Sequence, residues 1–248
     1  TDDVAYLETM ARDWKGELAN DELSENGLMA DKTMNTTLHL MEAYTELYLA
    51  DHSPKVLERL KFQLELTYDK IFDKQGNKLL VFFDKNMDVI GDIHSYGHDI
   101  EATWLIDRAT EVIGDPELTA KFAEMNKRIV RNIADIAYDK ASGSLLNERD
   151  KDKINTWRIW WVQAETVIGF MNGYQKGYGG EEYFEISSNV WKFIQEHIID
   201  KRPGGEWHSQ IDDQWKPADF KPMVDPWKCP YHNGRMCMEM MRRLAEKA

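Results

Sequence analysis

The chain has 248 residues, of which 30% are charged and 42% hydrophobic, and its formal net charge is -13 at pH 7. This is the composition of an ordinary globular protein, and the acidic balance argues against nucleic acid and anionic membranes as partners, because both select a basic surface. No apolar run approaches the roughly 20 residues of a membrane span, and the polar start of the chain does not resemble a signal peptide. The two cysteines, Cys229 and Cys237, exclude a disulfide scaffold and favour a reduced, cytoplasmic setting.

Helical periodicity dominates the chain. Helices are predicted, in chain order, near residues 2–19, 33–50, 54–72, 97–113, 116–139, 159–177, 181–200 and 230–246. Proline at Pro54 and Pro116 opens two of them, and the glycines between Gly177 and Gly180 end another. The segments between helices indicate a hairpin at 77–90, a short strand at 143–147 and a hairpin at 206–216 with its turn at Asp212 and Asp213.

The predicted order is an inner helix, a tight turn, an outer helix and a long excursion before the next inner helix. This order favours an all-α solenoid or toroid of helical hairpins, with short β-hairpins in the loops gathered at one end. No low-complexity segment or linker interrupts residues 1–248, so we interpret the chain as one domain.

Four stretches about sixty residues apart place a similar pair of side chains three residues apart at the start of a helix. The pairs are His39 and Glu42, His98 and Glu101, Val162 and Glu165, and His232 and Arg235. Two side chains at this spacing share one helix face. A repeated unit of this kind turns the same face inward each time and predicts a pocket surrounded by imidazoles and carboxylates.

Tryptophans lie next to polar residues in segments 160–165 and 227–232. Flat apolar rings beside carboxylates and amides suit sugar rings, which present C–H faces and hydroxyl edges.

These segments resemble the N-acylglucosamine 2-epimerase superfamily, and most closely its cellobiose 2-epimerase branch. The matching stretches are MNTTLHLMEAYT at 34–45, SYGHDIEATWL at 95–105, WWVQAE at 160–165 and WKCPYHNGR at 227–235. The resemblance implies an (α/α)6 barrel that needs no metal or nucleotide cofactor, binds a small carbohydrate and uses two histidines to exchange the C2 proton of a reducing-end sugar. A monomer or homodimer is expected.

A barrel of this kind has six inner helices, whereas about eight helices in all, four of them inner, are predicted here. Residues 1–248 are therefore expected to correspond to the C-terminal two-thirds of a typical family member, with the N-terminal helices missing. An open ring of helices is expected to expose apolar flanks.

The candidate catalytic residues are His98, His232 and His39. Epimerisation beside a carbonyl needs a base that removes the α-proton and an acid that returns one to the opposite face, and imidazole suits both tasks. His98 and His232 start different helices, so they can flank a planar enediolate. The resemblance casts His39, with Asn35 one turn earlier, as holding the substrate's oxygens; a polar network among the helices is the alternative.

Two carboxylates, Glu101 and Glu165, follow the candidate pairs and are predicted to fix an imidazole tautomer and accept sugar hydroxyls. Arg235 is assigned with them to substrate binding, and the alternative is that the acids form inward ion pairs with it.

Three tryptophans complete the predicted binding residues. Trp161 is interpreted as the platform for the reacting sugar, and the resemblance places Trp227 on the second sugar unit. Trp104, six residues after His98, is assigned to substrate binding with core packing as the competing interpretation.

The expected function is a sugar 2-epimerase that interconverts glucose and mannose at the reducing end of β-1,4-linked disaccharides such as cellobiose and lactose, through a cis-enediolate. A monosaccharide epimerase or aldose–ketose isomerase, and a carbohydrate-binding remnant without turnover, are the alternatives. A glycoside hydrolase is a further alternative. It would require two opposed carboxylates at the scissile bond, whereas imidazoles occupy the leading positions here. A metal site is disfavoured, because the pairs His94/His98 and Cys229/His232 lack a third ligand at helical spacing.

Overall fold

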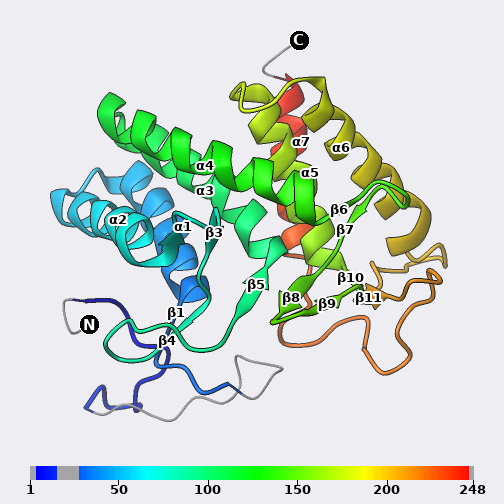
Figure 1. Ribbon diagram of the computed structural model, residues 1–248, viewed down its shortest axis with the longest axis horizontal. Helices are drawn as coiled ribbons and strands as arrows, with labels where there is room; N and C mark the ends of the chain where they lie inside the picture. The colour runs from blue at the N-terminus through cyan, green and yellow to red at the C-terminus, as the bar shows by residue number, and fades with distance from the viewer. Residues whose placement is uncertain (1–3, 16–27, 246–248) are drawn as a thin grey trace. The chain divides into compact units, whose positions relative to one another are not determined.

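The computed structural model describes residues 4–15 and 28–245 (Figure 1). The chain divides into two compact units, the first from residues 1–94 and 105–126 and the second from 95–104 and 127–248. Within the described residues, no helix has both the length and the apolar character needed to cross a membrane.

The first unit contains a helical hairpin with short strands around it. Its elements are α1 (Met34–Asp51), α2 (Pro54–Leu66), the π-helical turn η1 (Thr67–Ile71), β1 (Lys32–Thr33), β2 (Phe72–Asp73), β3 (Lys78–Leu79) and β4 (Phe82–Phe83). α1 begins where the Thr33 side chain accepts a hydrogen bond from the Thr36 backbone N–H at 3.0 Å, and it ends at His52, whose φ of 52° is left-handed. α1 packs against α2, and β1 pairs with β4 and β2 with β3, both antiparallel.

Two helices contribute to both units. α3 (Tyr96–Ile113) gives its residues up to Trp104 to the second unit, and α4 (Pro116–Ile136) gives its residues from Lys127 onward. The strand β5 (Ile93–Ser95) leads directly into α3.

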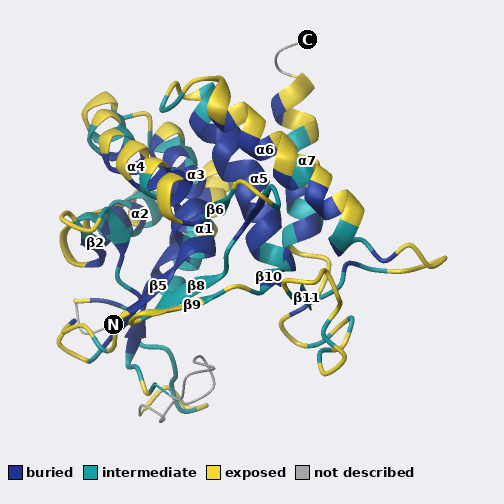
Figure 2. Cartoon of the chain, turned by 45° about the vertical axis from the view of Figure 1, so that its right-hand side comes forward, coloured by how far each residue is buried: buried dark blue, intermediate teal, exposed yellow. Residues whose placement is uncertain are grey.

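The second unit is built around α5 (Trp160–Gln175), which contacts both α6 (Glu181–Phe193) and α7 (His232–Ala245) (Figure 1). Every residue of α5 from 162 to 173 is buried, and the helix is dark blue along most of its length in Figure 2. A helix that is buried on all sides belongs in a core. α7 differs, because its side chains Met238, Met241 and Leu244 are exposed.

Short antiparallel pairs fill the connections of the second unit. They are β6 (Tyr138–Asp139) with β7 (Ser144–Leu145), β8 (Glu148–Asp150) with β9 (Lys153–Asn155), and β10 (Arg158–Ile159) with β11 (Gln210–Ile211). The last pair joins the residues just before α5 to Gln210 and Ile211, which lie much further along the chain. α6 continues into a second π-helical turn, η2 (Ile194–Ile198).

Most predicted elements are confirmed, including the seven helices from residue 33 onward and the short strand near 144. The hairpin turn at Asp212 is present, since its backbone N–H donates to the carbonyl of Lys216 at 3.0 Å, but Gln210 and Ile211 pair with β10. Within the expected 77–90 hairpin, Phe83 and Val89 form an antiparallel bridge, and Phe82 and Phe83 also pair with β1.

The predicted helix near 2–19 is wrong over residues 4–15, which form no helix, while residues 2–3 and 16–19 lie outside the described residues. Tertiary hydrogen bonds hold this segment instead. The backbone N–H of Glu8 donates to Asp31 at 3.0 Å, and its carboxylate accepts from the Thr36 hydroxyl at 2.7 Å. Local helical periodicity is a weak prior that such contacts override.

Candidate active site

Two glycines allow α3 and α5 to approach closely in the second unit. A Cβ atom built on Gly97 would lie 2.7 Å from both Trp161 and Val162, and one on Gly169 would lie 2.7 Å from the carbonyl oxygen of Ile100. Real Cβ contacts are longer than this, so only glycine fits without displacement. This close packing brings His98 and Trp104 of α3 into contact with Trp161 and Glu165 of α5, respectively.

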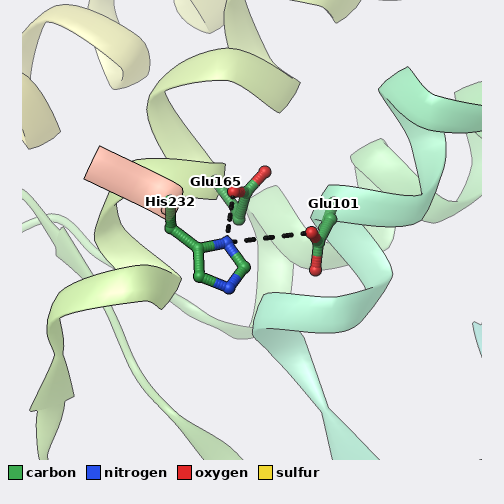
Figure 3. A group of neighbouring side chains, drawn as sticks. All are labelled: Glu101, Glu165 and His232. Atoms are coloured by element: carbon green, nitrogen blue, oxygen red, sulfur yellow. Dashed lines mark hydrogen bonds and ion pairs between the residues drawn. The ribbon is translucent and has the colours of Figure 1, made fainter. Parts of the chain in front are cut away.

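Glu101 from α3, Glu165 from α5 and His232 at the start of α7 converge at this contact (Figure 3). Nδ1 of His232 lies 2.7 Å from Oε1 of Glu165 and 3.9 Å from Oε1 of Glu101. Both glutamates are fully buried. Because the Glu165 carboxylate can only accept, Nδ1 of His232 carries the hydrogen, and Nε2 is the basic nitrogen of the neutral ring.

Arg235, one helical turn after His232, places its single positive charge between the two carboxylates. Its Nη2 donates to Oε1 of Glu101 at 2.5 Å and to Oε1 of Glu165 at 2.8 Å. The guanidinium also lies over the rings of Trp104 and Tyr231, 5.0 and 4.6 Å from their centroids. The inward ion pairs considered from the sequence are therefore present, and the contact of these three charged groups with substrate stays a prediction.

The charge of Glu165 is set by opposing effects. Burial by itself raises the pKa of this carboxyl, but the hydrogen bond from His232 and the positive charge of Arg235 outweigh it. The pKa of Glu165 is consequently held below its ordinary value of 4.5. The carboxylate is thus ionised at neutral pH and keeps the hydrogen of His232 on Nδ1.

The imidazoles of His98 and His232 border the same indole. The Trp161 ring centroid lies 4.7 Å from that of His98 and 5.4 Å from that of His232. Nδ1 of His98 is 2.7 Å from the hydroxyl of Ser95, so each imidazole has a hydrogen-bond partner on Nδ1. Two imidazoles from separate helices, each oriented through Nδ1, can exchange protons with one molecule bound between them.

Within the described residues, Glu101, Glu165 and His232 are also close enough together to hold a metal ion. One possible ligand atom from each residue lies within 4.8 Å of the other two. The Arg235 guanidinium already lies between the carboxylates and supplies the positive charge. A divalent cation would have to displace it, so this donor set fits an arginine better than a metal ion. The sequence candidates His94 and Cys229 are not part of the group.

The remaining predicted residues have different environments. Trp104 is 2% exposed and donates from Nε1 to Oε2 of Glu165 at 2.9 Å, which supports the packing interpretation. Trp227 is 74% exposed, on the loop before α7. Asn35 and His39 lie on α1 in the first unit, where Nδ1 of His39 is 3.0 Å from Glu42, and their contact with substrate stays a prediction.

The sequence interpretation missed three residues that contact the histidines. Ser95 lies one turn before His98, a spacing that could have indicated it. Tyr231 packs on His232 with centroids 4.4 Å apart and accepts a hydrogen bond from Arg235 at 2.6 Å. Trp160 meets the His232 ring edge-on at 5.4 Å, a contact that no local pattern reveals.

The family model for N-acylglucosamine 2-epimerase (GlcNAc 2-epimerase) matches residues 1–233. The chain belongs to this epimerase family. The match confirms the resemblance inferred from the four motifs around His39, His98, Glu165 and His232.

Members of the N-acylglucosamine 2-epimerase family resemble the chain over nearly its whole length. A cellobiose 2-epimerase of Ruminococcus albus is 55% identical over 242 residues, which cover 98% of this chain and 61% of that protein. A cellobiose 2-epimerase of Dictyoglomus turgidum is 43% identical over 242 residues, with coverages of 98% and 61%. The crystal structure of a sugar epimerase from a ruminal bacterium superposes with a TM-score of 0.92 at 56% identity, covering 96% of this chain and 60% of that one.

The chain therefore spans about three-fifths of the length of the curated relatives it matches. The structural similarity confirms the predicted fold class, the mostly helical α/α-toroid class with small strands in the loops.

Proposed function

We propose that the protein carrying this chain is a cellobiose 2-epimerase, which interconverts glucose and mannose at the reducing end of β-1,4-linked disaccharides such as cellobiose and lactose. One observation carries the proposal. His98 and His232, from different helices, both pack against the indole of Trp161, and each has a hydrogen-bond partner on Nδ1. The likeness to proteins named cellobiose 2-epimerase supports it.

The proposed reaction begins with opening of the pyranose, because only the open-chain form has the C1 carbonyl that acidifies the C2 proton. Nε2 of one imidazole takes this proton. The C2–H electron pair becomes the C1–C2 double bond, and the carbonyl oxygen takes up the negative charge of a cis-enediolate. The other imidazole, in its protonated form, then donates to the opposite face of C2, and the C1 carbonyl forms again.

We assign His232 to the side of the C2 proton in the glucose form and His98 to the opposite side. In the reverse reaction the two exchange roles, as microscopic reversibility requires. Glu165 keeps the His232 hydrogen on Nδ1, so that Nε2 is available as the base, and the ionised carboxylate stabilises the imidazolium after proton transfer. None of these steps requires a metal ion or a nucleotide.

Two tryptophans suit the two sugar units. Trp161 lies against both histidines, so we assign it to the reacting unit. Trp227 is exposed on the loop that leads into α7, and we assign it to stacking on the second unit. The protein is proposed to act in the cytoplasm, which the free thiols of Cys229 and Cys237 support.

Solvent isotope exchange tests the proposal. The full-length protein is incubated with cellobiose in heavy water, and the products are separated and analysed by NMR. We expect the mannose-type epimer with deuterium at C2, and His98→Ala and His232→Ala are each expected to lower kcat by about 100-fold or more. Turnover without deuterium at C2 contradicts the enediolate chemistry.

Substrate comparison separates the alternatives. Faster turnover of mannose or N-acetylglucosamine than of cellobiose would identify a monosaccharide epimerase or isomerase instead. Calorimetric binding of cellobiose with no product would identify a carbohydrate-binding protein.

A further inference from the structure

A buried lysine lies in the loop between the exposed Trp227 and the start of α7. Lys228 is only 2% exposed. Removing an ammonium group from water costs substantial free energy. A buried lysine therefore needs an ion pair or hydrogen bonds that compensate for this cost. Nothing in the proposed proton transfer uses this charge.

The Lys228 ammonium has two such partners. It forms an ion pair with Oε2 of Glu206, and Nζ lies 4.5 Å from the ring centroid of Trp160. Trp160 in turn meets the His232 imidazole edge-on at 5.4 Å. The Trp160 side chain therefore lies between the Lys228 ammonium and the His232 imidazole and contacts both.

Glu206 binds the chain on both sides of His232. Its Oε2 pairs with Lys228, and its Oε1 accepts a hydrogen bond from the Asn233 side-chain amide at 2.8 Å. One carboxylate therefore fixes the residue four positions before His232 and the residue directly after it. The first turn of α7 cannot rotate without breaking at least one of these bonds.

The carboxylate itself is attached to an ordered segment. The carbonyl oxygen of Glu206 accepts from the backbone N–H of Asp200 at 3.1 Å, and the neighbouring Trp207 forms a β-bridge with Ile199, just after η2. Two residues further on, the carbonyl of Ser209 accepts from the Trp160 backbone N–H at 3.0 Å, at the start of α5. The segment from Glu206 to Ser209 consequently joins the starts of α5 and α7.

We propose that Lys228 and Glu206 are positioning residues for His232. They act through Trp160 and Asn233 and set the direction of the imidazole toward the C2 atom of the sugar. This inference rests on the proposed epimerase function. Proton transfer is sensitive to such direction, since a displacement of about 1 Å can lower a rate by about 100-fold.

The test compares Lys228→Met and Glu206→Gln with wild type in the full-length protein. Lys216→Met is the matched control, because that lysine is exposed on the preceding turn. We expect kcat for cellobiose epimerisation to fall by about 10- to 100-fold in the first two variants, with KM changed less than about threefold. The control should keep the wild-type kcat. If Lys228→Met does not fold, Glu206→Gln carries the comparison.

A second readout needs no turnover. In protein labelled with 15N-histidine, the Nδ1–H resonance of His232 reports its hydrogen bond to Glu165. We expect this resonance to shift or broaden in Lys228→Met and to stay unchanged in Lys216→Met. A wild type that does not exchange the C2 proton contradicts the epimerase proposal, whereas an unmoved His232 resonance contradicts the positioning role.

The double variant Lys228→Met/Glu206→Met separates positioning from stability alone. Replacing both partners of a buried ion pair by apolar side chains is often neutral for stability. We expect the melting temperature to recover toward wild type while kcat stays low. Recovery of kcat together with the melting temperature would overturn the inference, as would wild-type kcat in Lys228→Met.

Discussion

Glu165 and His232 are separated by 67 residues in sequence and joined by a hydrogen bond of 2.7 Å from Nδ1 to Oε1. The second carboxylate oxygen, Oε2, accepts from Trp104 at 2.9 Å. Both oxygens of a fully buried carboxylate are therefore occupied, and its direction toward the imidazole is fixed by α3, α5 and α7 together. The imidazole tautomer is a property of this three-helix contact.

Replacing the acceptor tests that arrangement. In Glu165→Gln the side chain keeps its size but loses its charge, so it no longer stabilises an imidazolium at His232 or balances Arg235. We expect kcat for cellobiose epimerisation to fall by about 10- to 100-fold. Glu196→Gln, at an exposed position on η2, is the control and should match wild type. Equal kcat values for the two variants would show that Glu165 has no part in proton transfer.

The depressed pKa of Glu165 predicts a pH dependence of stability. In the unfolded chain this carboxyl binds a proton near its ordinary value of 4.5, whereas the folded protein keeps it ionised to lower pH. Its contribution to the free energy of unfolding is therefore present above about pH 4.5 and is lost as pH falls through the folded-state pKa. Denaturant unfolding from pH 6 to pH 3 should show a steeper loss for wild type than for Glu165→Gln. Parallel curves would contradict the shift.

The sequence predicted the faces of the helices but not which faces meet. The three-residue spacing of His98 and Glu101 placed both on one side of α3, because helix geometry is local. The contacts of Arg235 with Glu101 and Glu165 join α7 to α3 and α5, and no spacing within one helix specifies them. The helix prediction near 2–19 was wrong for the same reason: contacts with a distant segment, here those of Glu8, cannot be read from local spacing.

Ser95 is expected to orient His98. Its hydroxyl lies 2.7 Å from Nδ1, so Ser95→Ala removes this hydrogen-bond partner of the ring without creating a large cavity. We expect kcat to fall by about fivefold, since the loss of one neutral hydrogen bond is worth about 1 kcal/mol, with little change in melting temperature. Ser53→Ala is the control, because the Ser53 side chain makes no capping bond to α2. Wild-type kcat in Ser95→Ala would show that the hydrogen bond from Ser95 is not needed to orient the imidazole.

Gly97 permits the contact between Trp161 and the start of α3. In Gly97→Ala the new methyl group would meet Trp161 and Val162 at 2.7 Å, so one of them must move. We expect a loss of about 1–3 kcal/mol in the free energy of unfolding and a lower kcat, because the displaced indole borders both histidines. Gly180→Ala is the matched control, since a Cβ there has no atom within 4 Å. Both variants are compared by denaturant unfolding and epimerisation assay, and equal stabilities would contradict the steric argument.

Trp227 is expected to select for the disaccharide. Its ring is 74% exposed and belongs to a turn in which Asp225 accepts hydrogen bonds from the backbone N–H groups of Trp227 and Lys228, at 2.8 and 2.7 Å. In Trp227→Ala the second sugar loses its stacking partner, so KM for cellobiose should rise by about tenfold, corresponding to about 1.4 kcal/mol. Deuterium exchange at C2 of glucose, which has no second ring, should be unaffected. Trp14→Ala removes a tryptophan of similar exposure, 78%, and should leave both substrates unchanged. An equal loss with glucose and cellobiose would place Trp227 against the reacting sugar instead.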